Sequence, residues 1–252
     1  MARIIVFDSG FGSLSIIKPI QQAVKSDIIY FADQKNFPYG QKSIPELTKI
    51  ITKRLELFEE KFKPDLIVVG SNTPSLLVQI KKKNVIKVLP PIKMAAKISV
   101  TGNIAILATH ATIKSKKLSE FIKKNKLARR INIKKINASK LVQLVESVKF
   151  IDDKNLCKRT INKVLSQEFS KYNIDVATLS STHLPFLLSF FNKQFPNVNF
   201  LDPGQEVADK VRKIVKKPSK RNSMKIFTSA KPEKFQKDLS KIGIKQKVTF
   251  LN

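Results

Sequence analysis

The chain has 252 residues, which is enough for one large domain or two small ones with a substantial core. Hydrophobic residues make up 42% of it, a share that excludes an intrinsically disordered chain. No apolar run approaches the ~20 residues that a membrane-spanning helix needs. Residues 1–8 fit a strand rather than a secretory signal, so we expect a cytoplasmic protein without a membrane partner.

The chain is strongly basic, with 48 Lys and Arg against 19 Asp and Glu, for a formal charge of +29. The basic residues are densest over 117–135 and 210–225. One interpretation is contact with nucleic acid or an anionic membrane surface. The other is a solvated lysine-rich surface, which a composition rich in Lys, Ile and Asn favours. No arginine cluster is interleaved with aromatics, so base stacking is not indicated, and weak non-specific nucleic-acid association through 210–225 stays an alternative.

The chain has few residues that bind metals. A single cysteine, Cys157, excludes an internal disulfide and any multi-cysteine metal site. Two histidines, His110 and His183, leave little else for a zinc cluster, so we predict no metal. Cys157 lies in a polar segment and is interpreted as an incidental thiol, whereas His110 fits a ligand-facing or a structural role equally well.

Short apolar segments alternate with longer segments of helical period. A helix is predicted over 47–62, stopped by Lys63-Pro64, and another begins near Pro232. Strands separated by helices predict an α/β protein whose parallel sheets carry helices on both faces. We expect buried strands at 4–7, 28–31, 66–69, 104–108, 131–136 and 176–179, and a last strand at 224–228.

Two internal similarities point to related halves. Residues 65–77 resemble residues 175–187, at an offset of 110, and residues 4–10 resemble 104–110, at an offset of 100. The turns of these segments follow strands, and open α/β sheets bind ligands at the carboxyl ends of their strands. We therefore predict two pseudo-symmetric parallel-sheet α/β subdomains, with the four turns lining a ligand cleft between them if the halves face each other.

Breaks in the pattern give the predicted boundaries. Residues 89–91 contain a rigid Pro-Pro pair, and residues 201–204 contain Asp-Pro-Gly. We expect the first half to comprise residues 1–91 plus 205–252, and the second half residues 92–204. The stretch 216–220 is interpreted as an exposed linker, and the aromatic run 186–191 as core.

Two turns carry candidate chemistry. Residues 8–13, Asp-Ser-Gly-Phe-Gly-Ser, follow a strand and open a helix, so their backbone N–H groups are able to hold an anion. They do not form the G-x-G-x-x-G dinucleotide fingerprint, and a tight turn with a capping aspartate explains them equally well. Residues 37–40, Phe-Pro-Tyr-Gly, form a further turn with an aromatic residue.

Phe7-Asp8-Ser9-Gly10, residues 27–31 and the segment 37–43 follow one another along the chain. In order and spacing, they resemble the opening of the glutamate racemases. Gly-Ser-Asn-Thr at 70–73 resembles that family's first Cys-Asn-Thr turn, and Ser-Thr-His-Leu-Pro at 181–185 its Cys-Thr-His-Tyr-Pro turn. Further matches lie at 108–115, 141–146 and 227–235.

The resemblance implies two α/β halves with glutamate between them, no cofactor, and a homodimer as a common state of that family. In that family one cysteine removes the α-proton and a second cysteine returns a proton on the opposite face. The two cysteine positions match Ser71 and Ser181, and the positions of their helper residues match Asp8, Glu146 and His183. The resemblance implies that glutamate is held by Asp8, Ser9, Pro38, Tyr39, Gly40, Asn72, Thr73, Thr112, Thr182 and His183.

The two serines leave the activity open. A thiol has a pKa of ~8.5 and an aliphatic hydroxyl is close to water at ~15.7, so pre-ionising the hydroxyl costs about 10 kcal/mol more. One hypothesis is a weak racemase in which Asp8 and His183 relay protons. A second is a non-catalytic amino-acid sensor or partner-binding protein. A third is a different enzyme that uses Ser181, His183 and Glu146 as nucleophile, base and acid.

Overall fold

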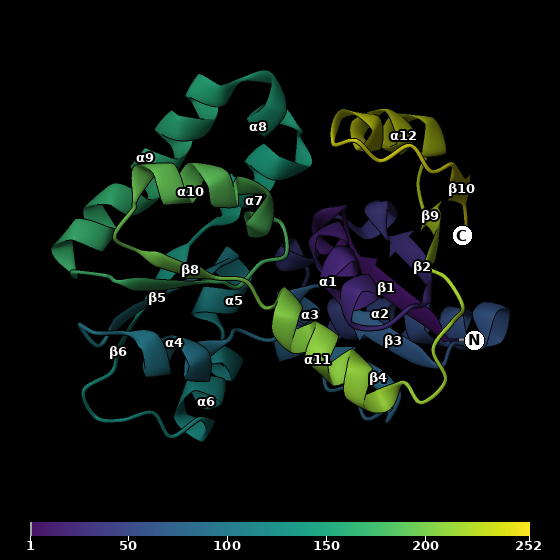
Figure 1. Ribbon diagram of the computed structural model, residues 1–252, viewed down its shortest axis with the longest axis horizontal. Coiled ribbons are helices and arrows are strands. Elements are labelled where there is room, and N and C mark those ends of the chain that lie inside the picture. Colours follow the sequence, from purple (N-terminus) through teal and green to yellow (C-terminus); the bar gives the residue numbers. More distant parts are fainter. Residues whose placement is uncertain (1) are drawn as a thin grey trace. The chain divides into compact units, whose positions relative to one another are not determined.

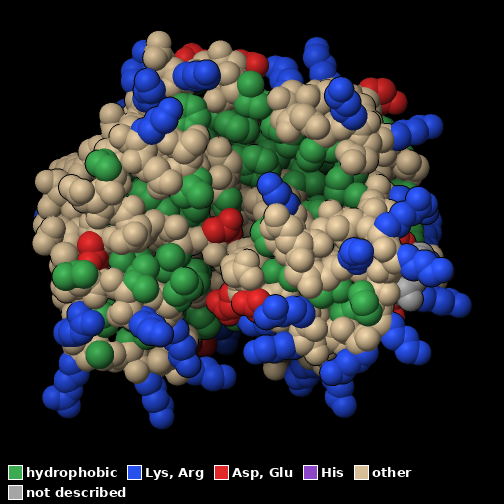
Figure 2. Space-filling model, viewed as in Figure 1, with side chains coloured by type: hydrophobic (Ala, Val, Ile, Leu, Met, Phe, Trp, Pro, Cys, Tyr) green, Lys and Arg blue, Asp and Glu red, His purple; other side chains and the backbone are tan. Residues whose placement is uncertain are grey.

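The computed structural model describes residues 2–252, which divide into two compact units. The first unit comprises residues up to Val88 together with Gly204–Asn252, and the second unit comprises Leu89–Pro203. Each unit has its own parallel sheet and its own helices (Figure 1). Lys and Arg side chains are scattered over the face of the molecule that Figure 2 shows.

The first unit contains a six-stranded sheet in the order β10-β9-β2-β1-β3-β4, and all neighbouring strands are parallel. Its strands are β1 (Arg3–Asp8), β2 (Asp27–Ala32), β3 (Leu66–Val69), β4 (Val85–Lys87), β9 (Ser223–Thr228) and β10 (Val248–Phe250). Its helices are η1 (Gly12–Ile16), α1 (Ile17–Ala23), η2 (Gln34–Asn36), η3 (Tyr39–Gln41), α2 (Ile44–Phe62), α3 (Asn72–Leu77), α11 (Gly204–Ile214) and α12 (Pro232–Lys241).

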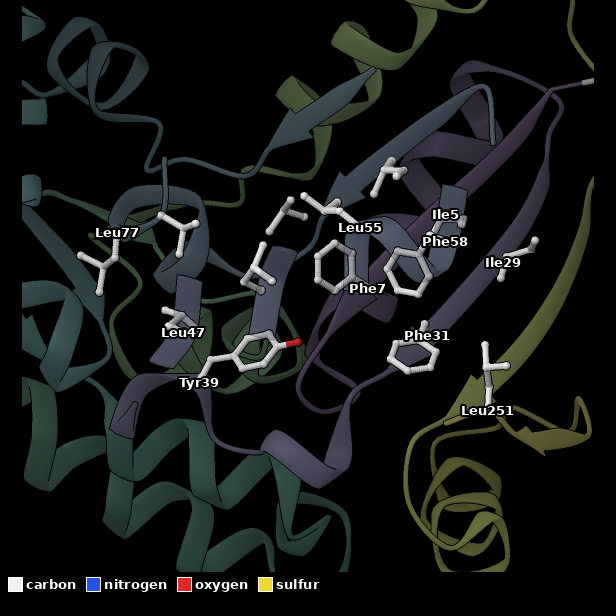
Figure 3. Packing of buried hydrophobic residues seen from close by; sticks show 14 residues of the cluster. Ile5, Phe7, Ile29, Phe31, Tyr39, Leu47, Leu55, Phe58, Leu77 and Leu251 are labelled. Carbon is white, nitrogen blue, oxygen red and sulfur yellow. The ribbon is translucent and has the colours of Figure 1, made fainter. Parts of the chain in front are cut away.

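Helix α2 closes one face of this sheet because its apolar residues recur at helical spacing. The ring of Phe58 meets the rings of Phe7 and Phe31 edge-on, each at a centroid distance of 5.1 Å (Figure 3). The helix begins three residues before the predicted start. The hydroxyl of Ser43 accepts a hydrogen bond from the backbone N–H of Glu46, which satisfies one of the free N–H groups of the first turn.

The second unit contains a four-stranded parallel sheet in the order β6-β5-β7-β8. Its strands are β5 (Asn103–Ala108), β6 (Asn132–Asn137), β7 (Val176–Leu179) and β8 (Asn199–Leu201). Its helices are α4 (Ile92–Ile98), α5 (His110–Lys114), α6 (Lys116–Lys124), α7 (Ser139–Glu146), α8 (Lys149–Asp152), α9 (Lys154–Lys171), η4 (Leu184–Leu187) and α10 (Leu188–Gln194).

The two sheets share a topology. The order β2-β1-β3-β4 in the first unit corresponds strand for strand to β6-β5-β7-β8 in the second. The register corresponds as well, since Ile4 pairs with Leu66 and Ile104 pairs with Val176. These partners differ by the offsets of 100 and 110 found in the sequence. The predicted fold class of two related parallel-sheet α/β halves is confirmed.

Some local predictions were wrong. The strand expected at 131–136 is β6, an edge strand that is mostly half-buried or exposed, because only one neighbour covers it. Ser219, in the stretch interpreted as an exposed linker, is buried, and its hydroxyl accepts a hydrogen bond from the backbone N–H of Ala2 at 3.0 Å.

Within residues 2–252, no helix combines the length and apolar character that crossing a bilayer requires.

Candidate functional site

Ser71 and Ser181 occupy corresponding positions in the two units. Each follows a residue whose backbone N–H extends the sheet by one hydrogen bond, Gly70 to Phe7 O at 2.8 Å and Ser180 to Leu107 O at 2.9 Å. Both serines therefore lie at the carboxyl end of the strand beside the central one, where α/β sheets bind ligands. Ser71 is half-buried and Ser181 is buried. Within residues 2–252, neither hydroxyl makes a hydrogen bond to another protein group.

The turns after β1 and β3 bring further predicted residues to the edge of the first sheet. The carboxylate of Asp8 is buried and accepts a hydrogen bond from the backbone N–H of Ser9 at 2.6 Å. Asn72 and Thr73 are buried at the start of α3. The amide of Asn72 donates to Val88 O at 3.1 Å, while its Oδ1 is buried without a partner among the described residues. This oxygen is an unused acceptor, the kind of group that an ammonium donor satisfies.

A buried carboxylate, Asp33, organises the turn after β2. It is fully buried and accepts hydrogen bonds from Tyr39 Oη, Arg54 Nη2, Ser229 Oγ and Asn36 Nδ2, each at 2.9 Å. Burial, and then the charge and hydrogen bond of Asp33, raise the pKa of Tyr39 well above its usual range, so the phenol stays protonated.

The Asp33 cluster fixes the segment that contains Pro38, Tyr39 and Gly40. Tyr39 is buried, and its two neighbours are half-buried. The sequence indicated this turn but not the hydrogen bonds of Asp33 that hold it in place. Asp33 directly after a buried strand was the available signal, but Arg54 and Ser229 come from distant positions that only the folded chain joins.

In the second unit, the predicted residues lie in α5, at the end of α7 and in the turn after β7. Thr112 is fully buried in α5, and its hydroxyl lies 3.1 Å from that of Thr109. His183 Nε2 lies 2.7 Å from Glu146 Oε2, with 5% and 14% of the two side chains exposed. Thr182, which stands between Ser181 and His183 in the chain, is buried. The structure thus joins two of the predicted helper residues in one hydrogen-bonded pair.

Three other side chains that the sequence singled out, Ser181, His110 and Cys157, make no hydrogen bond to that pair within the described residues. Ser181 makes no hydrogen bond to His183, so the link from nucleophile to base that a catalytic triad requires is not formed within the described residues. His110 is exposed, and its Nδ1 lies 3.5 Å from the Asn137 amide. The thiol of Cys157 is buried, and this burial, with the nearby Asp153, raises its pKa to about 11, so it is an inert thiol.

Residues 2–252 hold no group of three or more His, Cys, Asp and Glu side chains arranged to bind a metal ion. The chemistry available at the two sheet edges is therefore that of carboxylates, hydroxyls, amides and one imidazole. Such groups bind the ammonium and carboxylates of a small polar molecule and move protons.

Comparisons with known proteins agree with this architecture. No family model matches the chain. A glutamate racemase of Actinobacillus pleuropneumoniae serotype 5b (strain L20) is 32% identical over 219 residues, covering 84% of this chain and 81% of that protein. A solved glutamate racemase of Bacillus anthracis superposes with a TM-score of 0.86 at 22% identity, over 100% of this chain and 97% of the other. The Escherichia coli glutamate racemase, solved in complex with L-glutamate and the activator UDP-MurNAc-ala, gives 0.84 at 24% identity, over 99% and 98%.

Two parallel sheets of corresponding strand order, with polar turns at their carboxyl edges, give this chain the fold of the solved glutamate racemases. The Actinobacillus protein adds evidence from sequence, because it is 32% identical to this chain over 84% of the chain's length. The chain belongs to the glutamate racemase family.

Proposed function

We propose that this chain binds glutamate or a similar dicarboxylic amino acid, and that it does not carry out thiol-dependent two-base racemisation. The observation that carries this proposal is the pair Ser71 and Ser181. They stand at corresponding positions after β3 and β7. By the resemblance of their motifs, these positions match those of the catalytic cysteines of the glutamate racemases. Their hydroxyls make no hydrogen bond within residues 2–252, so both are available to a ligand.

The binding half of the proposal assigns a polar group to each part of the amino acid. Asn72 Oδ1, buried without a protein partner, accepts a hydrogen bond from the α-ammonium, and Asp8 supplies the negative charge. In this proposal, the remaining predicted residues supply hydroxyl and backbone donors for the carboxylates. These donors are Ser9, Pro38-Tyr39-Gly40 (through the N–H groups of Tyr39 and Gly40), Thr73, Thr112, Thr182 and His183.

The catalytic half rests on the strength of a base. Racemisation needs one group that takes the α-proton and another that gives a proton to the opposite face. The thiol–hydroxyl gap of roughly 7 pKa units corresponds to about 10 kcal/mol at 1.36 kcal/mol per unit. Neighbouring charges shift a pKa by ~3–5 units at most, and the same neighbours would lower the pKa of a thiol too. The gap between serine and cysteine therefore persists in any such environment.

A second route uses the groups that remain. Asp8 and His183 are both acid–base side chains, and the 2.7 Å contact with Glu146 holds the imidazole of His183 in one orientation. A slow proton relay through these two residues would give weak racemisation without a thiol. This alternative predicts exchange of the α-hydrogen of glutamate that is lost in His183→Leu and kept in His110→Leu.

Calorimetric titration with L- and D-glutamate tests the binding proposal. We expect saturable binding of at least one enantiomer with no interconversion. Thr182→Val should raise Kd about three- to tenfold, because it deletes a hydroxyl worth ~0.5–1.5 kcal/mol. The matched control is Thr178→Val, a buried threonine of β7 whose hydroxyl contacts Ser180 Oγ at 2.9 Å and which is outside the proposed binding set. Failure of the wild-type chain to bind either enantiomer would overturn the proposal.

A further inference from the structure

A groove in the second unit lies outside the residues assigned to glutamate. It has a volume of about 430 Å³, within the ~300–1,000 Å³ range of small-molecule sites. Its walls come from α8, α9, η4 and α10. Figure 2 shows hydrophobic and basic side chains next to each other over this part of the unit. The lining comprises Phe150, Ile151, Lys154, Lys158, Phe186, Ser189, Phe190, Lys193 and Gln194.

Aromatic rings form the apolar part of the groove. Phe150 and Phe186 face it with ring centroids 6.1 Å apart, and Phe190 lines it from α10. The sequence interpretation of 186–191 as core holds for Phe191, which is fully buried, but Phe186 and Phe190 are only half-buried. The half-buried rings of Phe186 and Phe190 at a concave site offer a stacking surface for a planar ring.

Basic side chains form the rim. Lys154 and Lys158 are four residues apart on α9, so they point to the same side of the helix, and Lys193 joins them from α10. All three are exposed, and within residues 2–252 none makes an ion pair with a carboxylate. The lining includes no Asp or Glu among the described residues. Three ammonium groups over one groove favour a ligand with phosphates.

The amide of Gln194 indicates which hydrogen-bonding groups a ligand of this groove needs. Its Nε2 and Oε1 are both buried, and neither has a hydrogen-bond partner among the described residues. A buried polar atom without a partner is unfavourable, so a ligand that satisfies both atoms binds more tightly. The ligand must accept a hydrogen bond and donate one side by side. The edge of adenine does this, since its N6 donates while N7 accepts, and the Gln amide is a recognised partner of that edge.

We propose that this groove is a binding site for an adenine nucleotide, with the base stacked on the phenylalanines and paired to Gln194, and the phosphates held by Lys154, Lys158 and Lys193. An acyl anion would fill the apolar part but leave the amide unsatisfied, and an inorganic polyphosphate would use only the lysines. The site is independent of the proposed glutamate site. In the chain, however, Glu146 at the end of α7 shortly precedes α8, and His183 directly precedes η4, and α8 and η4 both line the groove.

The experiment is equilibrium dialysis of the full chain with radiolabelled ADP at physiological salt, in competition with unlabelled UDP and tripolyphosphate. Because the chain carries a charge of +29, non-specific anion binding must be separated from the site. We expect saturable binding of one ADP per chain, with both competitors displacing it at least tenfold less well than ADP does. This outcome requires contacts to the base as well as to the phosphates.

Matched variants locate the site. Lys154→Ala/Lys193→Ala should weaken ADP binding about tenfold or more, whereas Lys216→Ala/Lys217→Ala, which removes the same charge from exposed positions of the first unit, should change it less than twofold. Gln194→Leu should weaken ADP binding tenfold and leave tripolyphosphate binding unchanged. Unfolding curves of Gln194→Leu check that the fold is intact. No saturable ADP binding, equal effects of the two lysine pairs, or equal displacement by tripolyphosphate would overturn the proposal.

Discussion

The carboxyl edges of the two sheets share a backbone and differ in chemistry. In the first unit the N–H of Asp33 donates to Asp8 O at 2.7 Å, and in the second the N–H of Ala138 donates to Ala108 O at 2.8 Å. These are corresponding positions in sheets of the same strand order. The first unit therefore buries two carboxylates where the second buries two alanines.

The two edges also differ in how their acidic side chains are paired. Asp33 is surrounded by four donors, one of them an arginine, so its charge is balanced where it is buried. At the second edge, the ionisable contact is that between Glu146 at the end of α7 and His183 after β7. A shared backbone thus sets where side chains lie, while their identity decides which polar contacts an edge makes.

The largest expected effect comes from removing the cation of the first edge. Arg54→Met leaves the fully buried Asp33 without its ion-pair partner at 2.9 Å, and such losses typically cost about 3–5 kcal/mol. The control Arg212→Met breaks a mostly exposed pair with Asp209 and should cost no more than ~1 kcal/mol. Urea unfolding of both variants checks this. Equal, small losses would show that the Asp33 cluster does not need its cation.

The second edge should respond less. His183→Leu removes a hydrogen-bond partner of the Glu146 carboxylate, and hydrogen bonds to charged groups contribute about 1.5–3 kcal/mol. Glu146 keeps 14% of its side chain exposed, so water reaches it more readily than it reaches Asp33. The other histidine gives the control, since His110 is exposed and His110→Leu should stay within ~0.5 kcal/mol of wild type. A loss larger than that of Arg54→Met would reverse the comparison.

A third substitution tests the residue before each serine. A Cβ on Gly70 would lie 2.3 Å from Ser13 Cβ and 3.0 Å from Phe7 O, so Gly70→Ala should destabilise by about 1–3 kcal/mol through overpacking. The second unit already has a side chain there, because Ser180 takes the corresponding position and its hydroxyl contacts Thr178 Oγ1. Ser180→Ala should therefore cost less than Gly70→Ala, by about 1 kcal/mol or more. Thermal unfolding distinguishes them, and equal shifts in Tm would contradict the predicted crowding at Gly70.

The smallest expected effect is on how the free energy of unfolding changes at acid pH, through Asp175. Burial acts against ionisation of Asp175, but hydrogen bonds from Ser99, Thr101 and Val100 outweigh it and lower its pKa. A lowered pKa in the folded state means stability that is present above the unfolded pKa and is lost as the pH falls through the folded one. Asp175→Asn should cost about 0.5–1.5 kcal/mol at pH 7 and progressively less below pH ~4. Unfolding across this range checks it, with a pH-independent cost as the contrary result.

Much of the fold could be predicted because buried parallel strands are continuous apolar runs. The segments 66–69 and 176–179 coincide with β3 and β7, and the offsets of 100 and 110 predicted two related halves, whose strand registers correspond. The edge strands β4, β8 and β10 were missed because three residues are too few for any periodicity.

The candidate site was predicted by resemblance and only in part by pattern. Residues next to strand ends, such as Asp8 and Ser181, could be found because position along a strand determines which edge they reach. The partners of Asp33 could not be found, because Arg54 and Ser229 approach it from a helix and from a distant strand. Likewise, nothing in the sequence indicates that Gln194 has a buried amide without a partner.

The central claim is that Ser71 and Ser181 cannot act as the thiol bases of a glutamate racemase. Its most direct test is incorporation of deuterium at the α-carbon of L- and D-glutamate in D₂O, followed by proton NMR, for the wild-type chain and for Ser71→Cys/Ser181→Cys. We predict no incorporation above the buffer blank for the wild type and clear incorporation for the double variant. Wild-type exchange at an ordinary enzymatic rate, near ~10 s⁻¹, would contradict the account.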